Sequence, residues 1–193
     1  MRWTAIGVTA LVGTCLVLPA RASSEMDVTI ELVAYAPGGD TFCVKVHDAQ
    51  RGDMLSVRRF ADGKPVQDFL LEGQDEKKVM RRIARKYHIT EAFALDQAAP
   101  DGSVTVVGGV PKKGAYAVTV LAGSRSGVLV RIPLLTDPES GRKATASLKQ
   151  VGWTADGKWV VLVVHQDLPG PYGMRVDQVQ PVKYRRWKVE WAR

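Results

Sequence analysis

Short apolar stretches separated by turn-forming residues dominate the chain from residue 28 onward. Over residues 41–47 (TFCVKVH), apolar Phe42, Val44 and Val46 alternate with other residues, which is the period of a strand with two different faces. Asp-Gly and Gly-Gly pairs between the stretches supply the positive φ angles that hairpin turns need. The pattern predicts strands within residues 28–35, 41–47, 54–60, 66–72, 99–110, 114–123, 126–135, 144–153, 159–164 and 174–193.

The hydrophobic period lengthens over residues 75–89 (DEKKVMRRIARKYHI), and this segment is the helix that the sequence predicts. Asp75 is placed to cap its amino end, and Glu76 lies in the first turn, where the helix dipole favours an acid. The expected apolar face consists of Val79, Met80, Ile83, Ala84 and Tyr87. The other faces are cationic, with Lys77, Lys78, Arg81, Arg82, Arg85 and Lys86.

The segment WTADGKWVVLVVHQ (153–166) combines a turn signal with a long β-branched run. Residues 159–164 are apolar on both faces, which predicts a central strand rather than an edge strand. Trp153 and Trp159 flank the turn, and we expect them to pack together across the hairpin. His165 ends the run, and we expect a backbone carbonyl to bind its imidazole.

These elements predict a single α+β domain over residues 23–193, mostly antiparallel β-sheet arranged as a meander or sandwich, with one amphipathic helix. The turns at 35–40, 100–102 and 153–158 resemble those of TolB-type and WD40-like β-propeller blades. That resemblance implies an alternative, an all-β propeller-like fragment. The Asp-Gly pairs are spaced unevenly, whereas propeller blades repeat every ~40–45 residues. The layout is also similar to predicted secreted bacterial proteins of unknown function, which implies export and a β-rich fold but no activity.

Residues 1–22 have the pattern of a signal peptide. Arg2 precedes an apolar run over 5–18, and Ala20-Arg21-Ala22 matches the small-x-small cleavage pattern. We therefore expect cleavage after Ala22 and a periplasmic or secreted protein. The alternative is a lipoprotein, because residues 12–15 approximate a lipid-attachment box ending at Cys15. No later apolar stretch is long enough to span a membrane.

The net charge of the full chain is +7, and removal of residues 1–22, with two cations and no acid, leaves +5. Such an excess favours anionic envelope polymers, lipid head groups or an acidic protein as partners, while export argues against nucleic acid. The six helix cations are the candidate anion-binding residues. The competing interpretation is a helix that covers a sheet and merely solvates its cations. The segment KYRRWKVEWAR (183–193) has two interpretations as well, a sugar- or acid-binding surface or a final strand with Trp187 and Trp191 in the core.

No catalytic, cofactor-binding or metal-binding residue is predicted. His47, His88 and His165 form none of the close pairs that metal sites use. Without Cys15, Cys43 has no disulfide partner, and we interpret it as a small half-buried residue rather than a thiolate activated by Lys45. The predicted function is therefore non-enzymatic binding or scaffolding in the bacterial envelope. The alternative is an envelope-polymer hydrolase whose carboxylates the fold brings together.

Overall fold

The computed structural model describes residues 26–112, 114–170, 173–185 and 188–192. The predicted signal segment and Cys15 lie outside these residues. The described helix is too short and too polar to cross a bilayer. Within the described chain the elements are β1 (Met26–Tyr35), β2 (Thr41–Asp48), β3 (Gly52–Arg59), β4 (Pro65–Leu70), α1 (Glu76–Tyr87), β5 (Glu91–Ala92), β6 (Thr105–Lys112), β7 (Ala115–Ala122), β8 (Arg125–Pro133), β9 (Thr145–Trp153), β10 (Trp159–Leu168), β11 (Met174–Lys183) and β12 (Glu190–Trp191).

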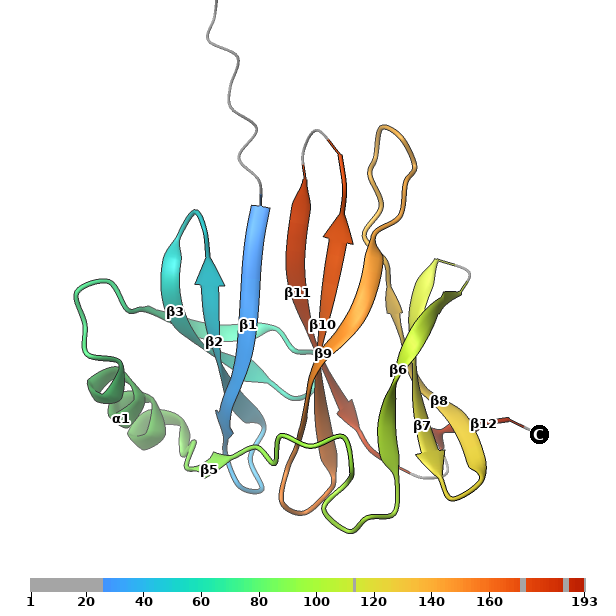
Figure 1. The fold of residues 1–193 in the computed structure, drawn as a ribbon. Coiled ribbons are helices and arrows are strands. Elements are labelled where there is room, and N and C mark those ends of the chain that lie inside the picture. The colour runs from blue at the N-terminus through green and yellow to red at the C-terminus, as the bar shows by residue number, and fades with distance from the viewer. Residues whose placement is uncertain (1–25, 113, 171–172, 186–187, 193) are drawn as a thin grey trace, which may run out of the picture.

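Two sheets contain these strands (Figure 1). The larger has the order β4-β3-β2-β1-β11-β10-β9, with β5 paired to β1, and the smaller has the order β12-β8-β7-β6. Neighbouring strands are antiparallel except β1 and β11, which run parallel and pair only from Met26–Val28 to Met174–Val176. The prediction of an α+β fold that is mostly antiparallel sheet is confirmed, and the described residues contain one α-helix. Figure 1 shows α1 at one end of the molecule and the smaller sheet at the other.

Strand β10 lies inside the larger sheet, between β9 and β11, as its two apolar faces predict. Val160, Leu162 and Val164 face the smaller sheet, whereas Val161 and Val163 face the opposite side. All five are completely buried. One strand therefore supplies both of the hydrophobic cores that it separates.

Three cores follow from this layout. The distal core lies between the smaller sheet and β9–β10 and includes Val118, Ile132 and Trp153. The central core joins β10 and β11 to β1, β2 and β3 through Phe42, Phe60, Phe93 and their neighbours. The helix core lies between α1 and the other face of β1–β3. Strand β2 contributes side chains to two of these cores. Phe42, Val44 and Val46 lie in the central core, whereas Cys43 lies in the helix core. The alternation of these residues in the sequence predicts this division.

Helix α1 begins where the sequence predicts. Asp75 caps it, because its side chain accepts a hydrogen bond from the Lys77 backbone N–H at 2.9 Å. It ends at His88, which adopts the left-handed conformation with φ of 56°. Val79 and Ile83 are buried against β1–β3, so the helix presents the predicted apolar face to the sheet.

The predicted contact between Trp153 and Trp159 is wrong. The turn pairs Trp153 with Val160, while Thr154 donates its backbone N–H to the Trp159 carbonyl. The two indoles thus occupy adjacent positions along the hairpin and point to opposite faces of the sheet. Trp153 meets Tyr184 edge to face in the distal core, and Trp159 stacks on Phe60 with ring centroids 5.0 Å apart.

Trp153→Ala should destabilise the protein by about 3–5 kcal/mol, because the side chain is fully buried and its removal leaves a large cavity. Trp159→Ala should cost less, since Trp159 is only partly buried. Trp153→Phe is the matched control: it keeps most of the volume and removes an indole N–H that has no hydrogen-bond partner among the described residues. Urea unfolding followed by far-UV circular dichroism measures all three. Equal midpoints for Trp153→Ala and the wild type would contradict this account of the distal core.

Candidate functional site

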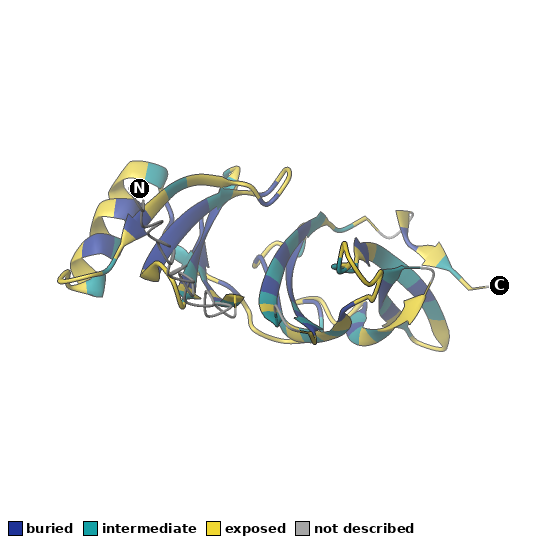
Figure 2. Ribbon diagram, turned by 90° about the horizontal axis from the view of Figure 1, so that it is seen from above, coloured by how far each residue is buried: buried dark blue, intermediate teal, exposed yellow. Residues whose placement is uncertain are grey.

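The outer surface of α1 carries the six predicted cations, of which all but Lys77 line one groove. Each of Lys77, Lys78, Arg81, Arg82, Arg85 and Lys86 is exposed, and Figure 2 shows the outward sides of α1 in yellow. The helix core holds the opposite side of α1 against the sheet. The cations are therefore presented on a firmly packed element.

Two of these cations rest on β4. The Arg82 guanidinium lies 5.1 Å from the centre of the Phe69 ring, a distance suited to a cation–π contact. Lys86 donates a hydrogen bond to the Gln67 Oε1 at 2.8 Å, and the Tyr87 hydroxyl donates to the same oxygen at 2.6 Å. Both contacts orient a cation without cancelling its charge.

A groove of about 920 Å³ runs along this flank of α1. Its lining comprises Gly73, Gln74, Asp75, Lys78, Val79, Arg81, Arg82, Arg85 and Lys86. We call this surface the cationic groove. Among the described residues no carboxylate forms an ion pair with its cations, and the first-turn Glu76 pairs with Lys45 on β2 instead, at 2.8 Å. An anionic ligand would therefore meet cations that are not already neutralised.

A second polar cluster lies on the central-core face of β9, β10 and β11. Its centre is Asp177 of β11, whose side chain is completely buried. The Asp177 Oδ2 accepts hydrogen bonds from the Ile30 backbone N–H at 2.8 Å and from Lys149 Nζ at 2.6 Å. Its Oδ1 lies 2.9 Å from Nδ1 of His165. One carboxylate thus joins β1, β9, β10 and β11.

The Asp177 cluster lies where the pairing between β1 and β11 ends. Regular pairing between these strands stops after Val28 and Val176, and Ile30, two residues further along β1, donates to the carboxylate instead. Two residues further along β1, the Leu32 backbone N–H donates a hydrogen bond to Gln150 Oε1 at 3.1 Å. Side chains therefore satisfy backbone groups that the sheet ladder no longer reaches.

The surroundings of Asp177 keep it ionised. Burial raises the pKa of the carboxyl, but the hydrogen bonds from Lys149, Ile30 and His165 outweigh this effect and lower the pKa below its ordinary value. An ionised carboxylate accepts but cannot donate, so the Nδ1 of His165 carries the proton. The lone pair of a neutral His165 is then on Nε2, on the side of the ring that faces away from Asp177.

Ser147 of β9 stands directly opposite His165, and His165 stands directly opposite Asp177. The three side chains therefore share one face of three adjacent strands. Ser147 is exposed, and about one third of the His165 side chain is exposed as well. A β-bulge next to this row shifts the register between Val163 and Val164.

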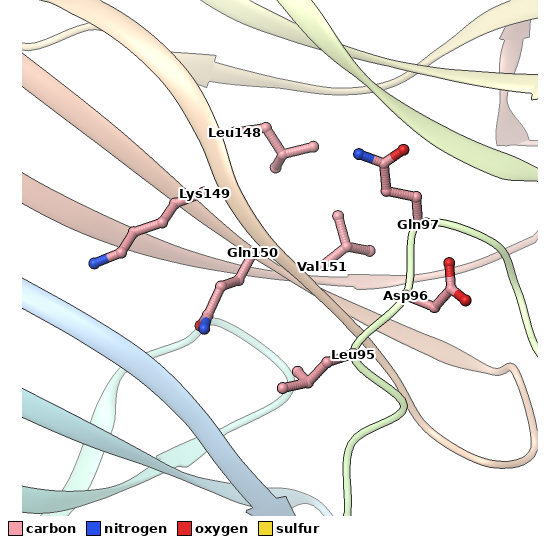
Figure 3. A pocket seen from close by; sticks show the side chains of 7 residues that line it. All are labelled: Leu95, Asp96, Gln97, Leu148, Lys149, Gln150 and Val151. Atoms are coloured by element: carbon pink, nitrogen blue, oxygen red, sulfur yellow. The ribbon is translucent and has the colours of Figure 1, made fainter.

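Figure 3 shows the hollow beside the same part of β9, with a volume of about 220 Å³. Lys149 and Gln150 point toward the side of β1, drawn in blue, whereas Leu148 and Val151 point the other way. The segment Leu95–Gln97 forms the opposite wall. The bulge therefore places two consecutive polar side chains, Lys149 and Gln150, on the face that holds Asp177.

The pattern of residues along the chain does not predict the Asp177 cluster. His165 was expected to bind a backbone carbonyl, and it binds the Asp177 carboxylate instead. The missed signal is the turn-forming segment 167–173, because a hairpin centred there pairs 165 with 177. The partners Lys149 and Ile30 had no comparable signal, since the bulge in β9 and the end of the β1–β11 pairing are set by packing.

Cys43 is fully buried in the core, rather than half-buried as the sequence predicts. Its side chain is inaccessible in the helix core, and burial, followed by the nearby Glu76 charge, raises the pKa of the thiol to about 12. Lys45 is bound to Glu76, and His47 is bound to Asp53. Neither residue therefore activates the thiol.

Two other sequence features can be placed. Among the described residues no group of three histidines, cysteines or carboxylates is arranged to hold a metal ion. At the C-terminus Val189 is buried in the distal core, and the Arg125 guanidinium lies 5.0 Å from the Trp191 ring centre. Trp187 lies outside the described residues.

Cys43 in the folded protein should react with a thiol reagent at about pH 8 at least 100 times more slowly than in the urea-unfolded chain. A thiol with a pKa of about 12 is almost entirely protonated at that pH, and the surrounding core blocks access. Peptide mass spectrometry measures the reaction at Cys43 alone. Comparable rates in the two states would contradict the assignment.

Asp177→Asn should destabilise the protein at neutral pH by about 1–3 kcal/mol, because the amide loses the charge that Lys149 and His165 bind. The lowered pKa of Asp177 means that its contribution is complete above the unfolded value of about 3.9 and is lost as the pH falls through the folded value. Urea midpoints from pH 7 to pH 2 should therefore converge for the two proteins at the acidic end. The exposed Asp96→Asn is the control, and a pH-independent gap for Asp177→Asn would refute the linkage.

No protein-family model, curated protein or solved structure matches this chain. Function is therefore inferred from its own two polar sites, the cationic groove of α1 and the Asp177 cluster.

Proposed function

We propose that the protein is a periplasmic or secreted binding protein of the bacterial cell envelope, which uses the cationic groove of α1 to hold an anionic partner without catalysing a reaction there. The partner is an anionic envelope polymer or a layer of anionic lipid head groups. Export is proposed from the signal-peptide pattern of residues 1–22. The observation that carries the binding proposal is the groove itself, with five cations along one flank of a helix and no ion pair to neutralise them among the described residues.

Two details favour binding over simple solvation of the helix. Arg82 and Lys86 are held against Phe69 and Gln67 of β4, so part of the entropy of ordering these long side chains is already spent in the free protein. The buried side of α1 is anchored by Val79 and Ile83. An anion in the groove would thus meet oriented donors, among which arginines suit carboxylate, sulfate and phosphate groups.

Binding should be electrostatic and removed by salt. The protein should bind heparin and vesicles containing phosphatidylglycerol at about 0.05 M salt, and release them by about 0.5 M. Vesicles of phosphatidylcholine alone should not retain it. Co-sedimentation and heparin affinity chromatography measure both effects.

Arg81→Glu/Arg85→Glu should weaken binding to the anionic vesicles at least about thirtyfold, given roughly 1 kcal/mol for each cation near such a surface. The matched control, Lys112→Glu/Arg142→Glu, changes the net charge equally at exposed positions outside the groove. It should alter binding by less than about threefold. Equal losses in the two variants, or no retention of the wild type at low salt, would reject the cationic groove as the binding site.

A further inference from the structure

We propose that Ser147, His165 and Asp177 form a second site, which cleaves an accessible carboxylic ester through an acyl-serine intermediate. The site is separate from the cationic groove and lies on the central-core face of β9–β11. The register carries the proposal: the three residues lie directly opposite one another on three adjacent strands. A nucleophile, a base and a group that orients the base are the parts that this chemistry requires.

The orienting contact is already formed. Asp177 is fully buried, and it holds Nδ1 of His165 at 2.9 Å while its other oxygen binds the Ile30 N–H and Lys149. A carboxylate fixed from two further sides cannot rotate freely, so it sets both the tautomer and the direction of the imidazole. Nε2 is thereby left as the acceptor, and it points away from β11.

Ser147 lies on the side of His165 opposite to Asp177. Directly opposed residues of neighbouring strands have their Cβ atoms about 4.5–5.5 Å apart, so the hydroxyl and the imidazole are within reach of one substrate group. No hydrogen bond joins Ser147 and His165 in the free protein. Contacts of this kind often tighten only when substrate is bound.

The reaction proceeds in two balanced steps. Ser147 Oγ bonds to the ester carbonyl carbon and passes its proton to His165 Nε2, which returns it to the leaving alcohol as the ester C–O bond breaks. Water then attacks the acyl-serine, gives one proton to Nε2 and releases the carboxylic acid, and the proton returns to Ser147. Asp177 stays ionised and stabilises the imidazolium during both steps.

The surroundings of Ser147 favour an ester that can reach an open strand face. Ser147 is exposed and about one third of the His165 side chain is exposed, whereas neither residue lines the hollow of about 220 Å³ beside β9, so that hollow does not hold the acyl group. The Lys149 ammonium has N–H donors beyond the one that Asp177 accepts, and it brings positive charge to the face on which an oxyanion would form. The substrate class is therefore a solvent-accessible carboxylic ester, for which an acetyl ester is the simplest probe.

The experiment is labelling with a fluorophosphonate, which phosphonylates activated serines, with peptide mass spectrometry to locate the label. Ser147 should be the labelled residue, and the protein should hydrolyse p-nitrophenyl acetate. Ser147→Ala should abolish both signals, and His165→Gln should slow both about 100-fold. Ser103→Ala, at another exposed serine, should change neither.

Far-UV circular dichroism and urea midpoints establish that each variant is folded. Asp177→Asn is excluded as the primary test because it is expected to destabilise the protein. Absence of label on Ser147 in the folded wild type, labelling that His165→Gln leaves unchanged, or hydrolysis that persists in Ser147→Ala would overturn the proposal. Arg81→Glu/Arg85→Glu should leave labelling intact, so failure of the ester site and failure of the cationic groove are distinguishable.

Discussion

The double burial of β10 is the constraint on which the rest of the structure depends. Val160, Leu162 and Val164 need one apolar layer, and Val161 and Val163 need another, because no side of the strand tolerates water. The smaller sheet provides the first layer, and β1–β3 with Phe60 and Phe93 provide the second. Both cores thus depend on β10, and α1 packs on the other face of β1–β3.

This packing arrangement also accounts for the Asp177 cluster. The N-terminal strands must turn away from β11 to close over the central core, which ends the parallel pairing after three residue pairs. The backbone N–H groups of Ile30 and Leu32 then need other acceptors, and Asp177 and Gln150 supply them. Burying a carboxylate is costly unless several donors surround it, and the carboxylate that Ile30 and Lys149 fix in place orients His165 in turn. Asp177 therefore both accepts the hydrogen bond that the Ile30 backbone N–H needs and orients the imidazole of His165.

The local spacing of apolar and polar residues was sufficient to predict the helix and some of the strands. The helix could be predicted because its apolar positions recur at helical spacing and Asp75 marks its start, and the exposed cations followed from the same period. The two-sided burial of β10 and the two faces of β2 could be predicted because neighbouring side chains in a strand alternate. The contact of Trp153 with Trp159 was wrong, since one residue of turn register decides whether two side chains share a face.

By itself, the sequence determined the strand-rich texture, the amphipathic helix, its cationic surface and the central position of β10. All of these depend on residues within one turn or one strand of each other. Only the tertiary structure decided that Ser147, His165 and Asp177 share a row and that the N-terminal strand donates to Asp177 from 147 positions away. Those relations depend on the bulge in β9, the register of two hairpins and the point at which β1 leaves β11. Packing of the whole chain fixes them, because no single segment contains the groups that satisfy one another.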